Sequence, residues 1–342
     1  MTTDQLKPIL FRADGDARIG LGHVMRCLAL ADMLGTAFDR HFALVQPAPE
    51  LVRLIEEKGV TVVPLRTDDA AEFLDVVTPG SVVVLDGYAF DPTYQRAVRE
   101  RAKRLVYIDD LTDVEQVADV VINHAGGVTE YDYQSEPYTQ FLLGPRYALL
   151  RPPFFGAFGD TPREGPIFVS LGGADPHNVS LRVLDALRLT FREMGQSWRV
   201  HLVLGPFHPN RASIDAYRGQ LKHLLILDNL TAEQMAAELK KCQLAITACS
   251  TVAYEVCAVG RPLIALQTAD NQKRIADFLQ NEMLAVQVAE VNDALGSYDL
   301  TPALVQSLQH SYMGRPVLAR QRRYFDGRSP DRFRALFERL CS

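Results

Sequence analysis

One glycine-rich stretch near the start of the sequence runs directly into a histidine. Residues 12–26 read RADGDARIGLGHVMR, between an apolar run that predicts a strand and a run that predicts a helix. Gly20 and Gly22 let the backbone approach an anion closely, and the free N–H groups at a helix start favour a diphosphate. The third glycine of the dinucleotide fingerprint is absent, so the two glycines alone are a weak signal. His23 is then expected in the first helical turn.

An imidazole at such a position could act as a general base. Histidine side chains titrate near neutral pH, at about 6.5, so a neutral ring can take a proton from water. Asp14 or Asp16 could orient His23. The alternative is a helix-capping or surface histidine; we favour catalysis because a glycine directly precedes the ring at the end of the first strand. Asp14 and Asp16 also resemble a metal-binding pair, but such pairs are frequent, and we expect neither metal nor cofactor.

Two loops in the second half of the sequence could hold phosphates. Gly172 and Gly173 follow an apolar run, and a tight turn explains them equally well. Ser250 and Thr251 start a predicted helix, where hydroxyls bind phosphates or cap the helix. Glu255, one turn later on the same helical face, could accept both hydroxyls of a ribose.

Several other strand ends carry polar or aromatic residues. Asn271 and Gln272 could bind sugar hydroxyl or acetamido groups, although the same residues are common at helix starts. Tyr88, after the run SVVVLDG, offers an aromatic face to a sugar ring. Residues 86–87, 109–110 and 123–124 also end apolar runs, but there we expect turns.

Apolar runs alternate with helical stretches through most of the sequence, which predicts parallel sheets covered on both faces. The first half has six such runs, and the second half has five. We therefore expect an α/β protein of the GT-B type, with two Rossmann-like domains facing each other across a cleft. The expected boundaries are residues 1–150, a proline-rich linker at 151–165, a second domain at 166–315, and terminal helices at 316–342 that cross back to the first domain.

The composition excludes several classes of function. The formal net charge is −6, without the clustered basic residues that nucleic acids or anionic membranes require. Five cysteines without a C-x-x-C pair indicate neither a disulfide framework nor a zinc site. No signal segment and no apolar run of about 18 residues is present. We expect a cytoplasmic protein, monomeric, that acts on a small molecule.

Taken together, these loops resemble the UDP-2,4-diacetamido-2,4,6-trideoxy-β-L-altropyranose hydrolases of pseudaminic acid biosynthesis, which are related to MurG-type glycosyltransferases. The resemblance covers most of the chain. The segments that carry it are RADGDARIGLGHVMRCLALA, DGY, VYIDDL, LLGPRYALLRPPF, VSLGGADPHN, YEVCAVGRPLI and ADNQ. The sequence departs from the family pattern at Asp16, where a serine is expected, and at Ser250, where a glycine is expected.

The resemblance implies metal-independent, inverting hydrolysis of a UDP-sugar at its anomeric carbon, in a pathway that supplies flagellin or surface glycosylation. It implies His23 as the general base. The diphosphate and nucleotide would contact Gly20, Gly22, Gly172, Gly173, Ser250, Thr251 and Glu255, and the sugar would contact Asp14, Tyr88, Asn271 and Gln272. The alternative is a GT-B glycosyltransferase that uses a UDP-amino sugar donor.

Overall fold

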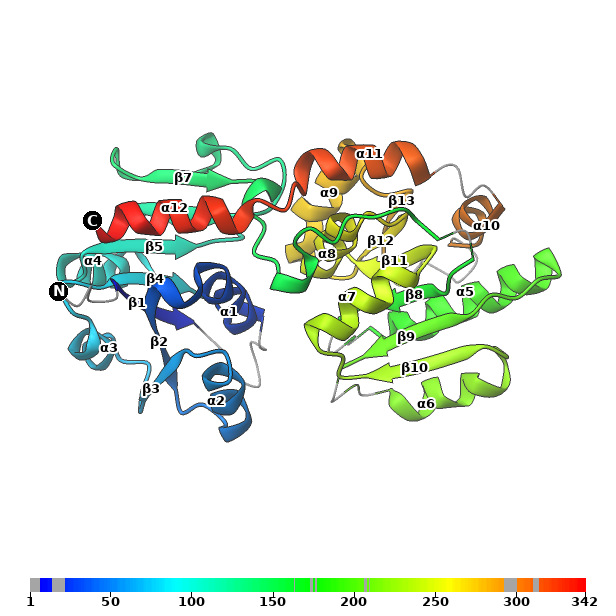
Figure 1. Ribbon diagram of the computed structural model, residues 1–342, viewed down its shortest axis with the longest axis horizontal. Coiled ribbons are helices and arrows are strands. Elements are labelled where there is room, and N and C mark those ends of the chain that lie inside the picture. Colours follow the sequence, from blue (N-terminus) through cyan, green and yellow to red (C-terminus); the bar gives the residue numbers. More distant parts are fainter. Residues whose placement is uncertain are drawn as a thin grey trace. The chain divides into compact units, whose positions relative to one another are not determined.

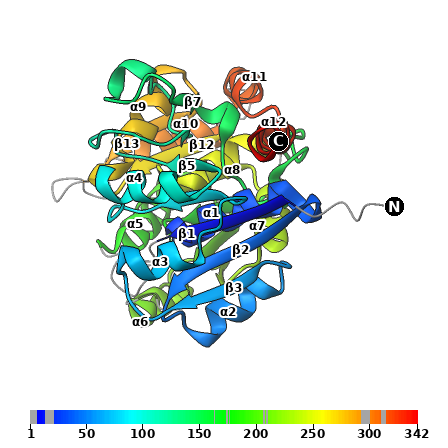
Figure 2. The ribbon, with the colours of Figure 1, turned by 90° about the vertical axis from the view of Figure 1, so that its left-hand side faces the viewer.

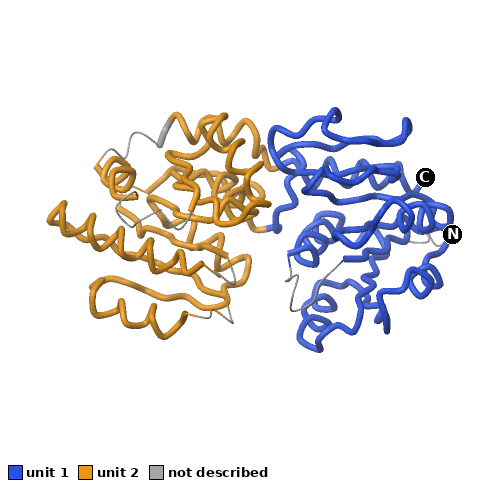
Figure 3. Tube along the Cα trace, turned by 180° about the vertical axis from the view of Figure 1, so that it is seen from behind, with its two compact units in different colours: residues 1–152, 328–342 blue, residues 153–327 orange. Residues whose placement is uncertain are grey.

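The chain divides into two compact units in a computed structural model (Figure 3). The first unit comprises Met1–Pro152 and Arg328–Ser342, and the second comprises Pro153–Gly327. The structure describes residues 7–13, 22–162, 164–172, 175, 177–205, 208, 210–291, 300–309 and 314–342. The chain thus passes from one unit to the other twice, before Pro153 and after Gly327.

The first unit is built on a seven-stranded sheet in the order β3-β2-β1-β4-β5-β6-β7. Every neighbouring pair is parallel, and Figure 2 shows β1, β2 and β3 side by side. The strands are β1 (Lys7–Ala13), β2 (Phe38–Val45), β3 (Thr61–Leu65), β4 (Val82–Asp86), β5 (Arg104–Ile108), β6 (Val120–Asn123) and β7 (Gln140–Leu143). The central strand β4 is buried throughout, as its run of valines predicts.

Helices cover both faces of this sheet. They are α1 (Gly22–Leu34), α2 (Pro49–Glu56), α3 (Ala70–Val76), α4 (Pro92–Arg101) and α12 (Ser329–Cys341) (Figure 1). Right-handed crossovers place α1 and α4 on opposite faces, because the strand order proceeds in opposite directions from β1 and from β4. Helix α12 packs against α1, and Phe337 contacts Phe38 with ring centroids 6.4 Å apart. The last helix is therefore part of the first unit.

The second unit repeats this topology with a six-stranded parallel sheet in the order β10-β9-β8-β11-β12-β13. Its strands are β8 (Ile167–Ser170), β9 (Val200–Leu204), β10 (Leu224–Asp228), β11 (Leu244–Ala248), β12 (Leu263–Gln267) and β13 (Gln287–Glu290). Its helices are α5 (Val179–Met194), α6 (Arg211–Asp215), α7 (Ala232–Lys241), α8 (Thr251–Val259), α9 (Lys273–Asn281), α10 (Thr301–Gln309) and α11 (Gly314–Tyr324). Buried aliphatic side chains of β8, β9, β11 and α5 form its core.

Each sheet has a topological switch point, the position at which the strand order reverses. In the first unit it lies between β1 and β4, and in the second between β8 and β11. Open α/β sheets bind ligands beyond the carboxyl ends of the strands at this position. The residues that follow these four strands are therefore the first candidates for a functional site.

Candidate active site

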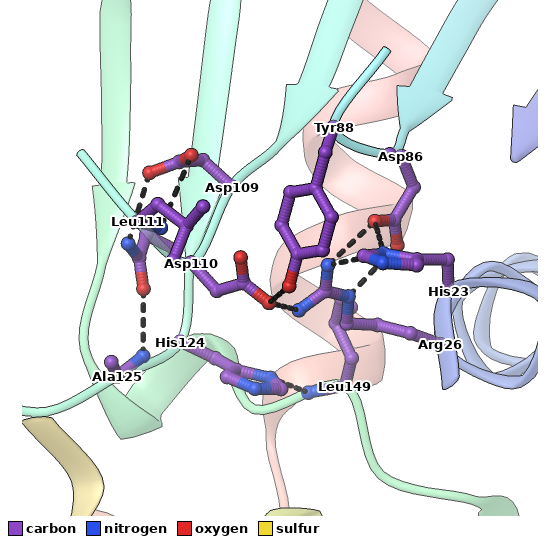
Figure 4. A network of polar contacts seen from close by, with 12 residues as sticks. His23, Arg26, Asp86, Tyr88, Asp109, Asp110, Leu111, His124, Ala125 and Leu149 are labelled. Carbon is purple, nitrogen blue, oxygen red and sulfur yellow. Dashed lines mark hydrogen bonds and ion pairs between the residues drawn. The ribbon is translucent and has the colours of Figure 1, made fainter. Parts of the chain in front are cut away.

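His23 lies at the switch point of the first unit. Helix α1 starts at Gly22, after β1, and β1 pairs with β4 so that Ala13 is opposite Asp86. His23 Nδ1 is 2.7 Å from Asp86 Oδ1, and both residues are buried (Figure 4). The last residue of a central strand thus holds the histidine at the start of the first helix.

This contact determines which ring nitrogen carries the proton. A carboxylate only accepts hydrogen bonds, so a neutral His23 donates its Nδ1–H to Asp86. Arg26 Nη2 is 3.1 Å from the same Nδ1, but it donates to Asp86 Oδ1 at 2.5 Å. Nε2 then carries the lone pair, and within the described part of the chain no group hydrogen-bonds it. The arrangement is that of a general base oriented by a carboxylate.

Arg26 connects two carboxylates. Its Nε donates to Asp86 Oδ2 at 2.8 Å, and its Nη1 donates to Asp110 Oδ2 at 2.9 Å. Burial opposes ionisation of Asp86, but Arg26 and His23 outweigh it and hold the pKa of Asp86 below its usual value. Burial likewise opposes the charge on Arg26, and the two carboxylates raise the pKa of Arg26 well above its usual value. Asp86 and Arg26 are therefore both charged at neutral pH.

Tyr88 forms the exposed side of this cluster. Its ring meets the His23 ring edge to face, with centroids 4.7 Å apart. Its hydroxyl donates to Asp110 Oδ2 at 3.4 Å, and the residue is 48% exposed. An aromatic ring that is half exposed beside a candidate base can pack against a ligand.

A second polar cluster anchors the loop that carries Asp110. Asp109 Oδ2 accepts hydrogen bonds from the Tyr133 hydroxyl (2.8 Å), the Asn123 amide (3.3 Å) and the Thr112 N–H (3.0 Å). Thr112 has a left-handed backbone with φ of 65°. Burial raises the pKa of Asp109, although these donors oppose the shift. Asp109 therefore fixes the turn that directs Asp110 toward Arg26.

His124, at the end of β6, is a buried neutral imidazole near the same cluster. Its Nδ1 accepts a hydrogen bond from the Leu149 N–H at 3.3 Å, so its proton is on Nε2. Burial, followed by the positive charge of Arg26, lowers the pKa of His124 to about 4. It is therefore uncharged at neutral pH.

The second unit brings five of the predicted residues to one edge of its sheet. Gly172 follows β8 with φ of 91°, Ser250 and Thr251 follow β11, and Asn271 and Gln272 follow β12, the next strand. Ser250 is the N-cap of α8 but makes no side-chain cap bond. Gln272 accepts hydrogen bonds from the Thr268 N–H and hydroxyl, whereas Asn271 is exposed.

Two helix starts in this unit differ in what occupies them. The Asp175 carboxylate accepts hydrogen bonds from the Val179 and Ser180 N–H groups, both at 2.8 Å, and so caps α5. At the start of α8, the N-cap residue Ser250 makes no side-chain cap bond. Glu255 lies further along α8 and is only 3% exposed. The two helix starts thus differ, because a buried carboxylate already binds the N–H groups of α5.

Four predicted residues, Asp14, Asp16, Gly20 and Gly173, lie outside the described residues. Three residues of the cluster around His23 were missing from the predicted site: Asp86, Arg26 and Asp110. Asp86 ends one buried hydrophobic run and Asp110 follows another, which is a detectable signal. Their contacts with His23 and Arg26, however, depend on strand pairing.

Among the described residues, no group of three or more His, Cys, Asp or Glu side chains is placed to hold a metal ion. No described helix combines the length and apolarity needed to cross a bilayer.

The fold belongs to the GT-B class, in which two Rossmann-like domains form one chain. The structure is similar to that of MurG from Acinetobacter baumannii, with a TM-score of 0.65 over 97% of this chain and 99% of the other, at 14% identity. It is similar to the same degree to the calicheamicin glycosyltransferase CalG4, with a TM-score of 0.65 over 98% of both chains, at 15% identity. These similarities confirm the predicted fold class.

Two curated proteins resemble the sequence more directly. An uncharacterized protein of Methanocaldococcus jannaschii is 25% identical over 77% of this chain and 56% of its own length. The UDP-2,4-diacetamido-2,4,6-trideoxy-β-L-altropyranose hydrolase of Campylobacter jejuni is 26% identical over 53% of this chain and 66% of its own length. The chain thus matches less than two thirds of either relative. No protein-family model matches the sequence.

Proposed function

We propose that the protein is a UDP-sugar hydrolase that cleaves a UDP-2,4-diacetamido-2,4,6-trideoxy hexose at its anomeric carbon. The observation that carries the proposal is the His23–Asp86 pair, which leaves Nε2 of a buried imidazole as a proton acceptor at the switch point of the first sheet. The resemblance to the Campylobacter hydrolase supports the substrate class, and the GT-B fold supports a nucleotide-sugar.

The reaction requires one proton acceptor. His23 Nε2 takes a proton from water while the water oxygen bonds to the anomeric carbon. The bond from that carbon to the β-phosphate oxygen breaks, and UDP leaves with the bonding electrons. The configuration inverts because water attacks opposite the leaving group. The imidazolium then returns its proton to solvent.

The charges around His23 favour binding of the sugar there, and not of the diphosphate. Asp86 and Asp110 against Arg26 leave one net negative charge beside His23. Such a charge stabilises the positive charge that develops at an anomeric carbon and repels phosphates. We therefore assign the sugar, with Tyr88 against its ring, to this cluster.

The diphosphate is assigned to the second unit. The uncapped start of α8, with Ser250 and Thr251, offers N–H groups and hydroxyls to an anion. The backbone of Gly172 is open to an anion, because Gly172 has no side chain and a Cβ built there meets nothing within 4 Å. The cap that Asp175 places on α5 directs the phosphates to α8 in preference.

Proton NMR of a reaction mixture tests the proposal directly. The protein is incubated with the UDP-diacetamido-trideoxy sugar alone, and we expect free sugar and UDP, with the first anomer formed opposite in configuration to the substrate. Retention of configuration would contradict the single-base mechanism.

The rival is glycosyl transfer, which the transferase neighbours of the fold favour. A transferase would leave the UDP-sugar intact until an alcohol acceptor is added. If turnover begins only when a sugar or lipid alcohol is added, the protein is a transferase and not a hydrolase. His23 would then deprotonate the acceptor hydroxyl in place of water.

A further inference from the structure

The buried cluster around His23 contains an odd number of charges. Arg26 is bound by two carboxylates, Asp86 at 2.5 and 2.8 Å and Asp110 at 2.9 Å. Asp86 alone would neutralise Arg26 and leave His23 beside a neutral ion pair. Asp110 supplies the additional negative charge, although it does not contact His23 itself.

We infer that Asp110 is a positioning residue that strengthens His23 as a base through the charge it adds to the cluster. Proton uptake by His23 changes the sum of charges over His23, Arg26, Asp86 and Asp110 from −1 to 0. Without Asp110 the same step would go from 0 to +1 in a buried site, which costs more. The inference rests on the proposed function for its catalytic consequence, but the charge effect itself is independent of activity.

The fold holds Asp110 in place for this role. The turn after β5 is fixed by the hydrogen bonds from Thr112 and Tyr133 to Asp109. Tyr88 and Arg26 then bind the same oxygen of Asp110 from two other elements. The Asp110 carboxylate is thus held from two elements other than its own loop.

Other ionisable groups around His23 do not supply this charge. The described groups around the cluster are Cys27 and Arg26 of α1, Asp86 at the end of β4 and Tyr88 after it, Tyr107, Asp109 and Asp110 of β5 and its loop, and His124 after β6. Asp109 accepts hydrogen bonds from Tyr133, Asn123 and Thr112, and among the described residues no hydrogen bond joins it to His23 or Arg26. Burial raises the pKa of Cys27 and of Tyr107 and lowers that of His124, so these three are neutral at pH 7. Asp14 and Asp16 lie outside the described residues.

NMR titration of the His23 ring tests the inference without requiring activity. The His23 Cε1–H signal is assigned by its loss in His23→Ala, and its titration midpoint is compared between the wild type and Asp110→Asn. Removal of a nearby anion disfavours the imidazolium, so the midpoint should fall by about half a pH unit or more. Asp113→Asn is the matched control, because Asp113 is exposed on the same loop and the substitution removes the same charge.

Kinetics supply the second measurement. In Asp110→Asn the acid limb of the kcat/KM profile should move to lower pH and the plateau should fall, whereas Asp113→Asn should leave the limb in place. Asp110→Ser replaces the asparagine variant if the latter does not fold. An unchanged His23 midpoint in the charge-removing variant, or an equal shift in Asp113→Asn, would overturn the inference. Lack of hydrolysis by the wild type would contradict the proposed function and leave the titration result standing.

Discussion

At the scale of single residues, His23 is fixed on one side and available on the other. Asp86 binds Nδ1, and no described group binds Nε2. Replacing His23 with alanine should lower kcat by about 10² to 10⁴, the usual contribution of a positioned base. The affinity for UDP, measured by isothermal titration calorimetry, should change little because the diphosphate is assigned to the second unit. A loss of UDP binding equal to the loss of rate would instead place His23 at the nucleotide.

His124 makes the stability of the first unit dependent on pH. Its pKa is about 4 in the folded protein, below the value of about 6.5 in an unfolded chain. Between these values the unfolded state binds more protons, so stability is full above pH 6.5 and falls as pH drops toward 4. Between pH 7.5 and pH 5 this histidine should lower the free energy of unfolding by about 2 kcal/mol.

The variant His124→Asn isolates this effect, because the asparagine oxygen can accept the Leu149 N–H in place of Nδ1. Urea denaturation at the two pH values should show a smaller acid loss in the variant than in the wild type. Equal losses would show that His124 does not cause the pH dependence.

Sequence reasoning proposed His23 and Tyr88 as site residues and named Asp14 or Asp16 as the residue that could orient His23. The structure shows Asp86, 63 positions away, bonded to the ring. Asp86 was visible as the end of a buried strand, yet nothing local distinguishes a residue that binds His23 from a turn residue. The pairing of β1 with β4 brings the two together, and that pairing is a property of the whole sheet.

At the scale of elements, the last helix completes the first unit. Phe337 of α12 is fully buried, with its ring near Phe38, and Arg334 donates to the Met33 carbonyl at 2.7 Å. Phe337→Ala should lower the free energy of unfolding by about 3 to 5 kcal/mol, the usual cost of removing a buried aromatic ring. Glu338→Ala, one position along on the exposed face, should cost less than about 0.5 kcal/mol. Similar losses of thermal stability in both variants would contradict this role for α12.

The strands that the sequence analysis missed are β7 and β13, one of the two edge strands of each sheet. Each has only four residues, and neither is fully buried. Long apolar runs such as 82–86 were recognised because a strand buried on both faces requires them. An edge strand lacks that requirement. The edge strands β3 and β10, which were predicted, have five residues each, so the four-residue β7 and β13 carry a weaker pattern because they are also shorter.

At the scale of the whole molecule, Gly327 closes the second unit where the chain leaves it. Its φ is 74°, and a Cβ at this position would lie 3.3 Å from the Gly156 backbone nitrogen. Gly327→Ala should destabilise the protein by more than about 1 kcal/mol, since alanine is strained at positive φ and the contact adds to the strain. Gly195→Ala is the control, with φ of 64° and no atom within 4 Å. Differential scanning calorimetry should show the larger decrease in Tm for Gly327→Ala, and equal decreases would show that the contact is unimportant.

The return of α12 to the first unit has a consequence for biosynthesis. Residues 1–152 are synthesised first, but α12, which packs on them, is synthesised only after the whole of the second unit. Until then, the surface of α1 and β2 against which Phe337 packs stays uncovered by α12. The second unit, which is continuous in the sequence, is therefore fully synthesised before the first unit obtains its last helix, although the first unit was begun earlier.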